Sequence, residues 1–281
     1  MARPPYNLRL GGNTHHQFEL QFPSFIDVLS LSCSPILYFN RQNELMNDRH
    51  ASGSFMTIRG RKFLVTARHC LSGRDAFHDD PMDRNLFEPH KIRVFPSLRD
   101  ERGNVRRTTA DIILRDDDNT PQWLEDPEFR AFRTDIACVE IPENIQNNFV
   151  TVEEGYSEPA LFTHTGSSCF VVGFPSKNFA DPYFPIWRRG AIASEPRIPI
   201  DNKPIFLIDA MTSPGMSGSL VVQREFGPAA LRQPDGSLST NAMAVVTTKV
   251  IGVYGGRVAN SDALGDIGYC WYENRIRSIA R

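Results

Sequence analysis

Short apolar runs separated by turn residues follow one another along most of the chain. Many runs are rich in Val, Ile and Phe, and several end at Gly, Pro or Asn, a pattern typical of β-strands. The expected strands cover residues 35–40, 54–60, 61–67, 91–95, 111–116, 135–141, 168–175, 191–196, 204–210, 218–223 and 249–256. Repeated short strands with turns between them indicate an all-β sandwich or barrel.

Three segments depart from this pattern. The stretch 72–133 is polar and interrupted, which predicts long surface loops around a few strands. A terminal helix is expected over residues 272–281, with apolar positions at Ile276 and Ile279. A break near 143–160 predicts a link between two halves, so we assign residues 1–150 and 151–281 to two domains.

Composition and charge narrow the function. The chain has 281 residues, 41% hydrophobic and 23% charged, which is typical of a soluble globular protein with a sizeable core. The net charge is −2, so no basic excess suggests nucleic acid or an anionic membrane as a partner. No run is long and apolar enough to cross a bilayer. The first 17 residues lack the apolar stretch of a secretory signal, so we expect a cytoplasmic protein.

Five cysteines are present, an odd number with wide spacings and no CxxC pair. This pattern favours reduced thiols buried in the core of a cytosolic protein over a disulfide framework. We predict no metal site and no cofactor. The cysteines are Cys33, Cys70, Cys138, Cys169 and Cys270.

Three segments carry the candidate chemistry, and they occur in the order histidine, aspartate, serine. His69 follows an apolar strand, Asp135 opens another, and Ser217 lies in a loop between two glycines, Gly215 and Gly218. These are the three side chains that acyl transfer by an activated serine requires. We expect His69 to be the base, Asp135 to orient it, and Ser217 to be the nucleophile.

Each residue also has a structural alternative. A lone histidine is often a satisfied structural residue, and we assign that role to the other six. An aspartate at a strand start and a glycine–serine loop are both common in proteins. Because all three segments occur together and in this order, they favour catalysis. The glycine-permitted loop would also let the N–H groups of Gly215 and Ser217 converge on a developing oxyanion.

The segments TARHC, TDIACVEI and GMSGS resemble the histidine, aspartate and serine motifs of trypsin-like serine proteases. The likeness extends over most of residues 50–260 and is closest to bacterial, high-temperature-requirement-type members without their appended peptide-binding domain. It implies two six-stranded antiparallel β-barrels with the triad in the cleft between them. Residues 1–150 would hold an N-terminal extension and the first barrel, and residues 151–281 the second barrel and a short C-terminal helix.

The chain departs from that family at three positions. Secreted members have an aspartate before the nucleophile, which pairs with a freed N-terminal ammonium, whereas this chain has Met216. The cysteine after the histidine is present as Cys70, but the stretch 51–54 lacks the partner that secreted members use. The second glycine after the nucleophile is replaced by Ser219.

The resemblance also implies the substrate pocket. The residue six before the nucleophile lies at its base, which gives Met211, with Thr212 beside it. The walls would come from residues 251–257, and Tyr254, Gly255 and Gly256 would contact the substrate. An apolar base predicts cleavage after small or medium aliphatic side chains rather than after Lys or Arg, and Arg257 could reach the pocket and add an acidic preference.

Two classes of function remain. The first is a serine endopeptidase acting on polypeptides through an acyl-enzyme. The alternative is a catalytically silent, protease-like binding or scaffold protein. Such proteins usually lose a member of the triad, and none is missing here, so the sequence favours the enzyme. The sequence is also compatible with a regulatory protein partner.

Overall fold

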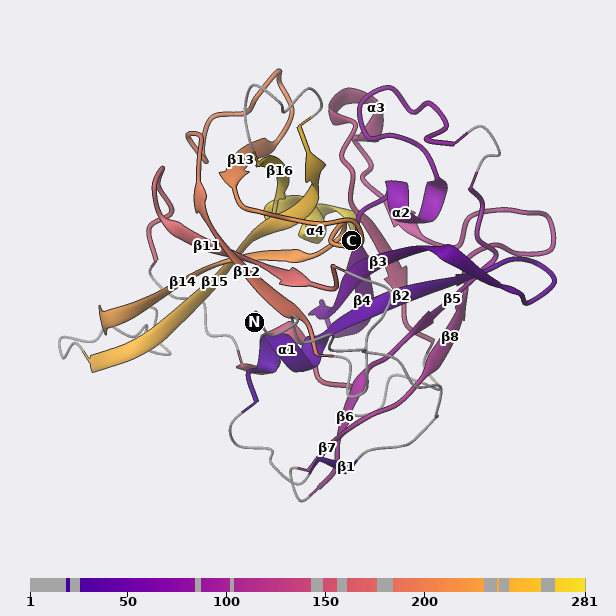
Figure 1. The fold of residues 1–281 in the computed structure, drawn as a ribbon, viewed down its shortest axis with the longest axis horizontal. Helices are drawn as coiled ribbons and strands as arrows, with labels where there is room; N and C mark the ends of the chain where they lie inside the picture. Colours follow the sequence, from indigo (N-terminus) through magenta and orange to yellow (C-terminus); the bar gives the residue numbers. More distant parts are fainter. Residues whose placement is uncertain are drawn as a thin grey trace, which may run out of the picture.

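The computed structural model describes residues 19–20, 26–83, 87–101, 104–142, 149–155, 161–175, 184–229, 237, 243–258 and 266–280. Within them the chain forms two β-rich halves with a few short helices (Figure 1). The strands of one half end before residue 141, and those of the other begin after residue 167. The all-β class is confirmed. Much of the expected link at 143–160 lies outside the described residues.

The first half is built on a seven-stranded sheet in the order β8-β5-β2-β3-β4-β10-β9. A three-stranded sheet in the order β1-β7-β6 lies beside it. Every pairing is antiparallel. The strands are β1 (Glu19–Leu20), β2 (Cys33–Phe39), β3 (Leu45–Ile58), β4 (Arg61–Thr66), β5 (Lys91–Val94), β6 (Ser97–Arg99), β7 (Val105–Arg107), β8 (Ala110–Ile113), β9 (Leu124–Glu125) and β10 (Ala137–Glu140).

The second half is the closed, six-stranded antiparallel barrel that the resemblance implied, in the order β11-β12-β13-β16-β15-β14. Strands β14 and β15 extend well beyond it as a long arm (Figure 1). The barrel strands are β11 (Ser168–Gly173), β12 (Ile186–Ile192), β13 (Ile205–Asp209), β14 (Leu220–Ala229), β15 (Met243–Arg257) and β16 (Ile267–Tyr272).

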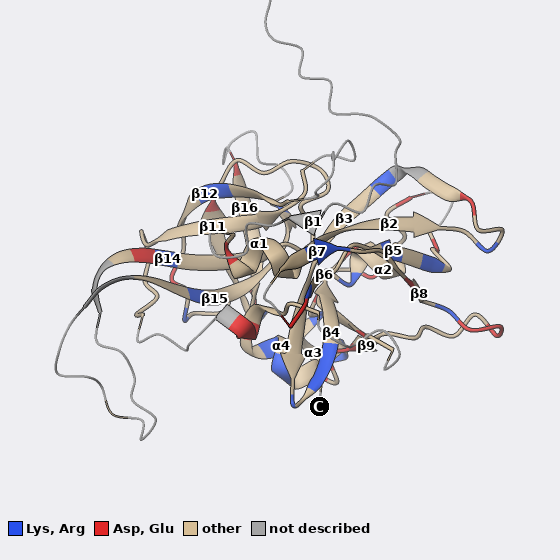
Figure 2. Cartoon of the chain, turned by 90° about the horizontal axis from the view of Figure 1, so that it is seen from below, with Lys and Arg blue, Asp and Glu red and all other residues tan. Residues whose placement is uncertain are grey.

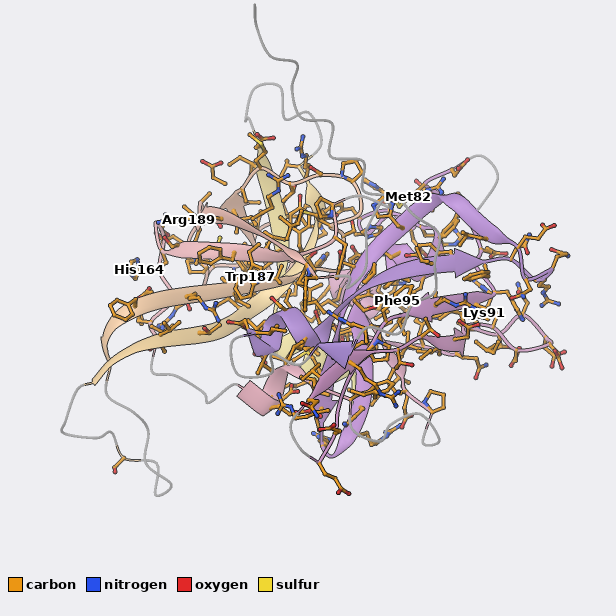
Figure 3. All side chains as sticks on the ribbon, turned by 60° about the horizontal axis from the view of Figure 1, so that its bottom comes forward. Met82, Lys91, Phe95, His164, Trp187 and Arg189 are labelled. Atoms are coloured by element: carbon orange, nitrogen blue, oxygen red, sulfur yellow. The ribbon has the colours of Figure 1, made fainter. Side chains whose placement is uncertain are left out.

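The helices among the described residues are short. The expected terminal helix is present as α4, which lies where the two halves meet (Figure 1). At the same junction Trp187 of β12, labelled in Figure 3, donates from Nε1 to Ser30 Oγ at 3.0 Å. The helices are α1 (Val28–Ser32), α2 (His69–Ser72), α3 (Phe129–Phe132), the 3₁₀ helix η1 (Val152–Gly155) and α4 (Asn274–Ile279).

One hydrophobic cluster joins the two halves. It contains Cys33 and Phe63 from the first half and Val172 and Trp271 from the second, all buried. Burying side chains of this size contributes about 1.5–3 kcal/mol each, so the shared core holds the halves together. All five cysteines are buried and free. Figure 2 shows positive and negative positions spread over both halves.

The structure differs from the sequence expectation in detail. The expected pair of β-rich halves is present, and the first is built, among the described residues, on a seven-stranded sheet rather than on six strands. The polar stretch 72–133 contains the expected strands β5 and β8 and also β6, β7 and β9, which were not expected, because pairing uses backbone groups and needs apolar residues on one face only. Strand β16 was not expected, and β12 begins at Ile186 rather than at residue 191, because its outward arginines mask the strand pattern.

Candidate active site

His69 stands directly after the last strand of a β-hairpin. Strands β3 and β4 are joined by Arg59 and Gly60, both with positive φ (51° and 79°), the geometry of a tight two-residue turn. Strand β4 ends at Thr66 and α2 begins at His69. The strand therefore fixes the position of the histidine backbone.

Asp135 lies beside His69 at the start of the segment that becomes β10, which pairs with β4. Its Oδ2 accepts a hydrogen bond from His69 Nδ1 at 2.7 Å, and its Oδ1 accepts the His69 backbone N–H at 2.7 Å. The carboxylate is fully buried. Because an ionised carboxylate can only accept, the proton lies on Nδ1, and Nε2 of the neutral ring is free to accept one.

This environment sets the proton affinity of His69. Burial alone would lower the pKa of the imidazole, but the charge of Asp135 and its hydrogen bond, with contributions from Cys70, raise that pKa well above its ordinary value. Because only the neutral ring can accept a proton, a pKa raised in this way shifts the active form of His69 toward more alkaline pH.

The loop that carries Ser217 is tightly constrained. Gly215 has φ of 95°, and a Cβ added there would lie 2.0 Å from His50 Nε2, so only glycine fits. Among the described residues, neither the Gly215 N–H nor the Ser217 N–H donates to another group. These are the two N–H groups that the sequence assigned to an oxyanion hole.

The structure does not join Ser217 to His69. Ser217 Oγ donates to the carbonyl of Gly255 at 3.3 Å, and His69 Nε2 lies 3.4 Å from Cys70 Sγ. Among the described residues no hydrogen bond connects the serine hydroxyl with the imidazole. The chain thus forms the His69–Asp135 pair, while the serine hydroxyl is held by the neighbouring strand.

A β-bulge places that carbonyl. The register between β15 and β16 shifts between Tyr254 and Gly256, so Gly255 is the extra residue. A Cβ on Gly255 would lie 2.2 Å from the ring of Tyr269, which explains why glycine is needed there.

The predicted pocket differs from expectation at its base. Met211 is 62% exposed, so it does not form a buried floor. Thr212 is buried instead, and its Oγ1 lies 2.5 Å from the hydroxyl of Tyr254, which is also buried. Burial raises the pKa of Tyr254 to about 12. Arg257 donates to the Thr212 carbonyl and pairs with Asp266 at 3.2 Å.

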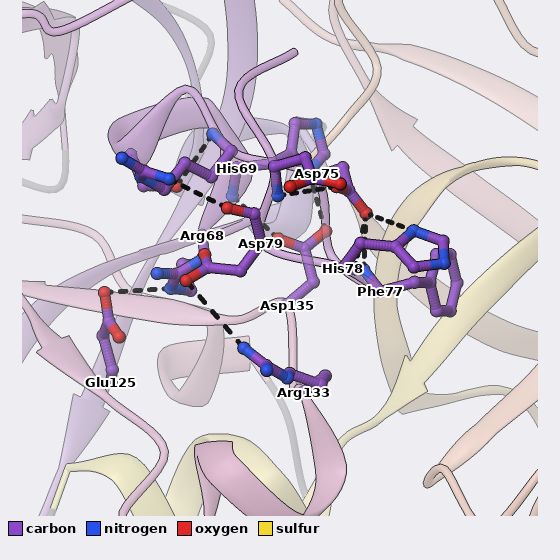
Figure 4. Close-up of polar contacts among 12 residues, drawn as sticks. Arg68, His69, Asp75, Phe77, His78, Asp79, Glu125, Arg133 and Asp135 are labelled. Atoms are coloured by element: carbon purple, nitrogen blue, oxygen red, sulfur yellow. Dashed lines mark hydrogen bonds and ion pairs between the residues drawn. The ribbon is translucent and has the colours of Figure 1, made fainter. Parts of the chain in front are cut away.

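An ion-pair network next to His69 was not anticipated (Figure 4). Arg68 is buried, donates from Nη1 to Asp79 Oδ1 at 2.9 Å, and places Nε 3.0 Å from Glu125 Oε1. Its guanidinium stacks over Phe129 at 4.2 Å. The residue before His69 is thereby tied to the segment before Asp135. An arginine after an apolar strand was the only sequence signal.

The loop after α2 packs against the second barrel. Asp75 accepts the backbone N–H groups of Phe77 and His78 at 2.8 Å and of Asp80 at 3.0 Å (Figure 4). The ring of Phe77 then lies 5.2 Å from that of Tyr269. This contact joins the two halves close to His69 and Gly255.

Comparison with known proteins identifies a family for this chain. The family model described as a trypsin-like peptidase domain matches residues 51–228, more than half of the chain. A comparison with curated proteins gave no match. Among solved structures, the protease Anisep from Arthrobacter nicotinovorans is 13% identical with a TM-score of 0.50, over 91% of this chain and 98% of that one.

Two further structures are less similar. A thermostable serine protease, AL20, from an extremophilic microorganism is 14% identical with a TM-score of 0.46, over 90% of this chain and 97% of that one. An HtrA-type protease solved with a decapeptide is 15% identical with a TM-score of 0.45, over 88% of this chain and 62% of that one. The family match, together with the antiparallel barrel that carries the serine loop, shows that the chain belongs to the trypsin-like peptidase family.

Proposed function

We propose that the protein is a serine endopeptidase that hydrolyses peptide bonds in polypeptides. The observation that carries the proposal is the His69–Asp135 pair, with two hydrogen bonds to one buried carboxylate. Among the described residues, the backbone N–H groups of Gly215 and Ser217 also donate to no other group. Catalytic hydrogen bonds are often long or unformed without substrate, so the missing Ser217–His69 bond is compatible with this role.

The reaction follows from these groups. After the side chain of Ser217 rotates away from Gly255, Oγ gives its proton to His69 Nε2 and attacks the peptide carbonyl carbon. The N–H groups of Gly215 and Ser217 bind the resulting oxyanion. The C–N bond breaks as His69 returns the proton to the leaving amine, and water then hydrolyses the ester with His69 again as the base.

A fluorophosphonate probe tests the proposal, because it reacts with an activated serine. Wild type should be labelled, Ser217→Ala should not, and Ser219→Ala, a change of the neighbouring serine in the same loop, should be labelled like wild type. Peptide hydrolysis should follow the same order. An unlabelled and inactive wild type would support the alternative, a silent binding or scaffold protein.

We also propose the reducing cytoplasm as its compartment. Five free, buried cysteines support this, because unpaired thiols persist where disulfides do not form. Thiol titration of protein isolated under non-reducing conditions and then denatured should find all five. A count reduced by pairs would contradict the proposal.

A further inference from the structure

Ser52 of β3, in the first half, contacts the loop of Ser217 in the second. Its backbone N–H donates to the Ser217 carbonyl at 3.0 Å, and its hydroxyl donates to the Gly215 carbonyl at 2.8 Å. The same hydroxyl accepts the N–H of Phe174 at 2.8 Å. Ser52 is buried, and its hydroxyl joins β3 to the Gly215 loop and to the segment that follows β11.

These bonds constrain the backbone on both sides of Met216. Because peptide groups are planar, fixing the carbonyls of Gly215 and Ser217 fixes two of the three peptide groups around the nucleophile. The side chain of Met216, between them, is fully buried in the barrel core. The remaining peptide group, which carries the Ser217 N–H, is left with little freedom.

Close packing around Ser52 restricts the position of the loop that carries Ser217. A Cβ on Gly218 would lie 2.3 Å from the Ser52 carbonyl oxygen, and one on Gly173 would lie 2.7 Å from its hydroxyl. Thr66 Oγ1 donates to the same Ser52 carbonyl at 2.7 Å, so Ser52 itself is held by the strand that leads to His69.

We infer that Ser52 is a positioning residue that holds the oxyanion-binding conformation of the Gly215–Ser217 loop. The inference rests on the proposed peptidase function. Met216 is buried where the resembling secreted proteases have a charged aspartate, so this chain uses a neutral hydroxyl from the opposite half and an apolar anchor instead of an ion pair.

The test compares Ser52→Ala with Ser54→Ala. Ser54 is buried two residues along the same strand, and its hydroxyl contacts only Cys33 Sγ, at 3.3 Å, among the described residues. A peptide boronic acid, which forms a tetrahedral adduct with the serine, reports on the oxyanion site. We expect Ser52→Ala to lower kcat and boronate affinity about 10-fold or more, with a smaller change in KM. Ser54→Ala should leave all three near wild type.

Ser52→Cys provides a second variant, with a somewhat larger side chain that is a weaker donor and acceptor, in case the alanine variant folds poorly. It should show the same selective loss of kcat with an unchanged thermal midpoint. The inference is overturned if either folded variant keeps wild-type kcat and boronate affinity. It is also overturned if Ser54→Ala loses both to the same extent. A wild type that fails to react with fluorophosphonate would instead refute the proposed function.

Discussion

Asp135 binds His69 through both carboxylate oxygens, one on the ring Nδ1 and one on the backbone N–H, each at 2.7 Å. The ring bond selects the tautomer in which Nε2 can accept a proton. The backbone bond joins the carboxylate to the main chain of His69, just after β4. One carboxylate therefore holds both the ring and the backbone of His69. Loss of the carboxylate charge should therefore change both the rate and its pH dependence.

We predict that peptidase activity is lost as pH falls through a raised His69 pKa. Burial alone would lower this pKa, but Asp135 and Cys70 raise it well above the ordinary value, and only the neutral ring can accept the Ser217 proton. In Asp135→Asn the raising charge is gone, so the burial effect dominates and the acid limb should move to lower pH. The rate should fall about 10⁴-fold, because the amide favours the other tautomer.

The pH profile of kcat/KM, measured for both proteins, checks this prediction. Glu140→Gln is a suitable control, because Glu140 pairs with Arg61 on the outside of the same sheet. An unchanged acid limb in Asp135→Asn would mean that His69 is not the titrating base.

The second prediction concerns Arg68. Its guanidinium reaches Asp79 and Glu125 and stacks on Phe129, which joins the backbone before His69 to the segment before Asp135. Lysine keeps the charge but lacks the planar fork and cannot make all three contacts. We expect Arg68→Lys to lower kcat by about 10-fold through misplacement of the base, with KM unchanged.

Arg61→Lys is the matched control for Arg68→Lys, because Arg61 lies in the same strand region but forms an exposed pair with Glu140. It should keep wild-type kcat. The pH profile adds a second readout, since weaker contact with Asp135 should lower the kinetic pKa in Arg68→Lys only. Equal behaviour of the two lysine variants would contradict a positioning role.

The sequence was sufficient for the family, the second barrel and the pairing of His69 with Asp135, because each depends on local signals, whereas the role of Ser217 stays a prediction. Apolar runs delimit most barrel strands, and glycines flank Ser217 where positive φ is needed. The positions of His69 and Asp135 follow from adjacent strands, β4 and β10, whose pairing brings them together.

The parts that could not be predicted depend on contacts between distant segments. In the sequence Ser52 is an ordinary strand serine, and its bond to Gly215 exists only because the second barrel packs against β3. Met211 and Thr212 are neighbours in sequence, but only Thr212 is buried, where its hydroxyl bonds to Tyr254. The Ser217–Gly255 bond depends on a bulge whose extra residue no periodic pattern reveals.

The third prediction is a stability difference at the C-terminal helix. Arg275 of α4 donates to both oxygens of Asp126 (2.8 Å from Nε and 2.6 Å from Nη2), and the Asp126 side chain is fully buried. Asp126→Ala removes the bonds to both carboxylate oxygens but leaves Arg275 paired with Glu128 at 2.9 Å, so the free energy of unfolding should fall by about 1.5–3 kcal/mol. Glu140→Gln, at the exposed pair, should change it by about 1 kcal/mol or less. Equilibrium urea unfolding measures both, and equal midpoints would contradict the assignment.

The last prediction concerns the side chain that precedes the scissile bond. The structure indicates a different pocket for it from the one expected from the sequence. The buried Thr212 and Tyr254 are joined by their hydroxyls at 2.5 Å, and Arg257 bonds the Thr212 carbonyl. These bonds connect the two segments that would flank the substrate side chain. The Tyr254 ring lies over Gly268, where an added Cβ would be 2.6 Å from the ring. The nearby carboxylate of Asp266 is paired with Arg257 and does not offer a site for a basic side chain.

We therefore expect cleavage after small side chains such as Ala, and not after Lys or Arg, because a cation placed there would lack a partner. Tyr254→Ala removes the ring and should extend cleavage to larger aliphatic residues, with fluorophosphonate labelling used to verify that Ser217 is still reactive. Tyr254→Phe keeps the ring and should keep the preference for small residues, since ring volume and not the hydroxyl limits the space. Cleavage profiles over a peptide library distinguish these outcomes. Dominant cutting after Lys or Arg by wild type, or an unchanged profile in a labelled Tyr254→Ala, would show that Tyr254 does not limit the pocket.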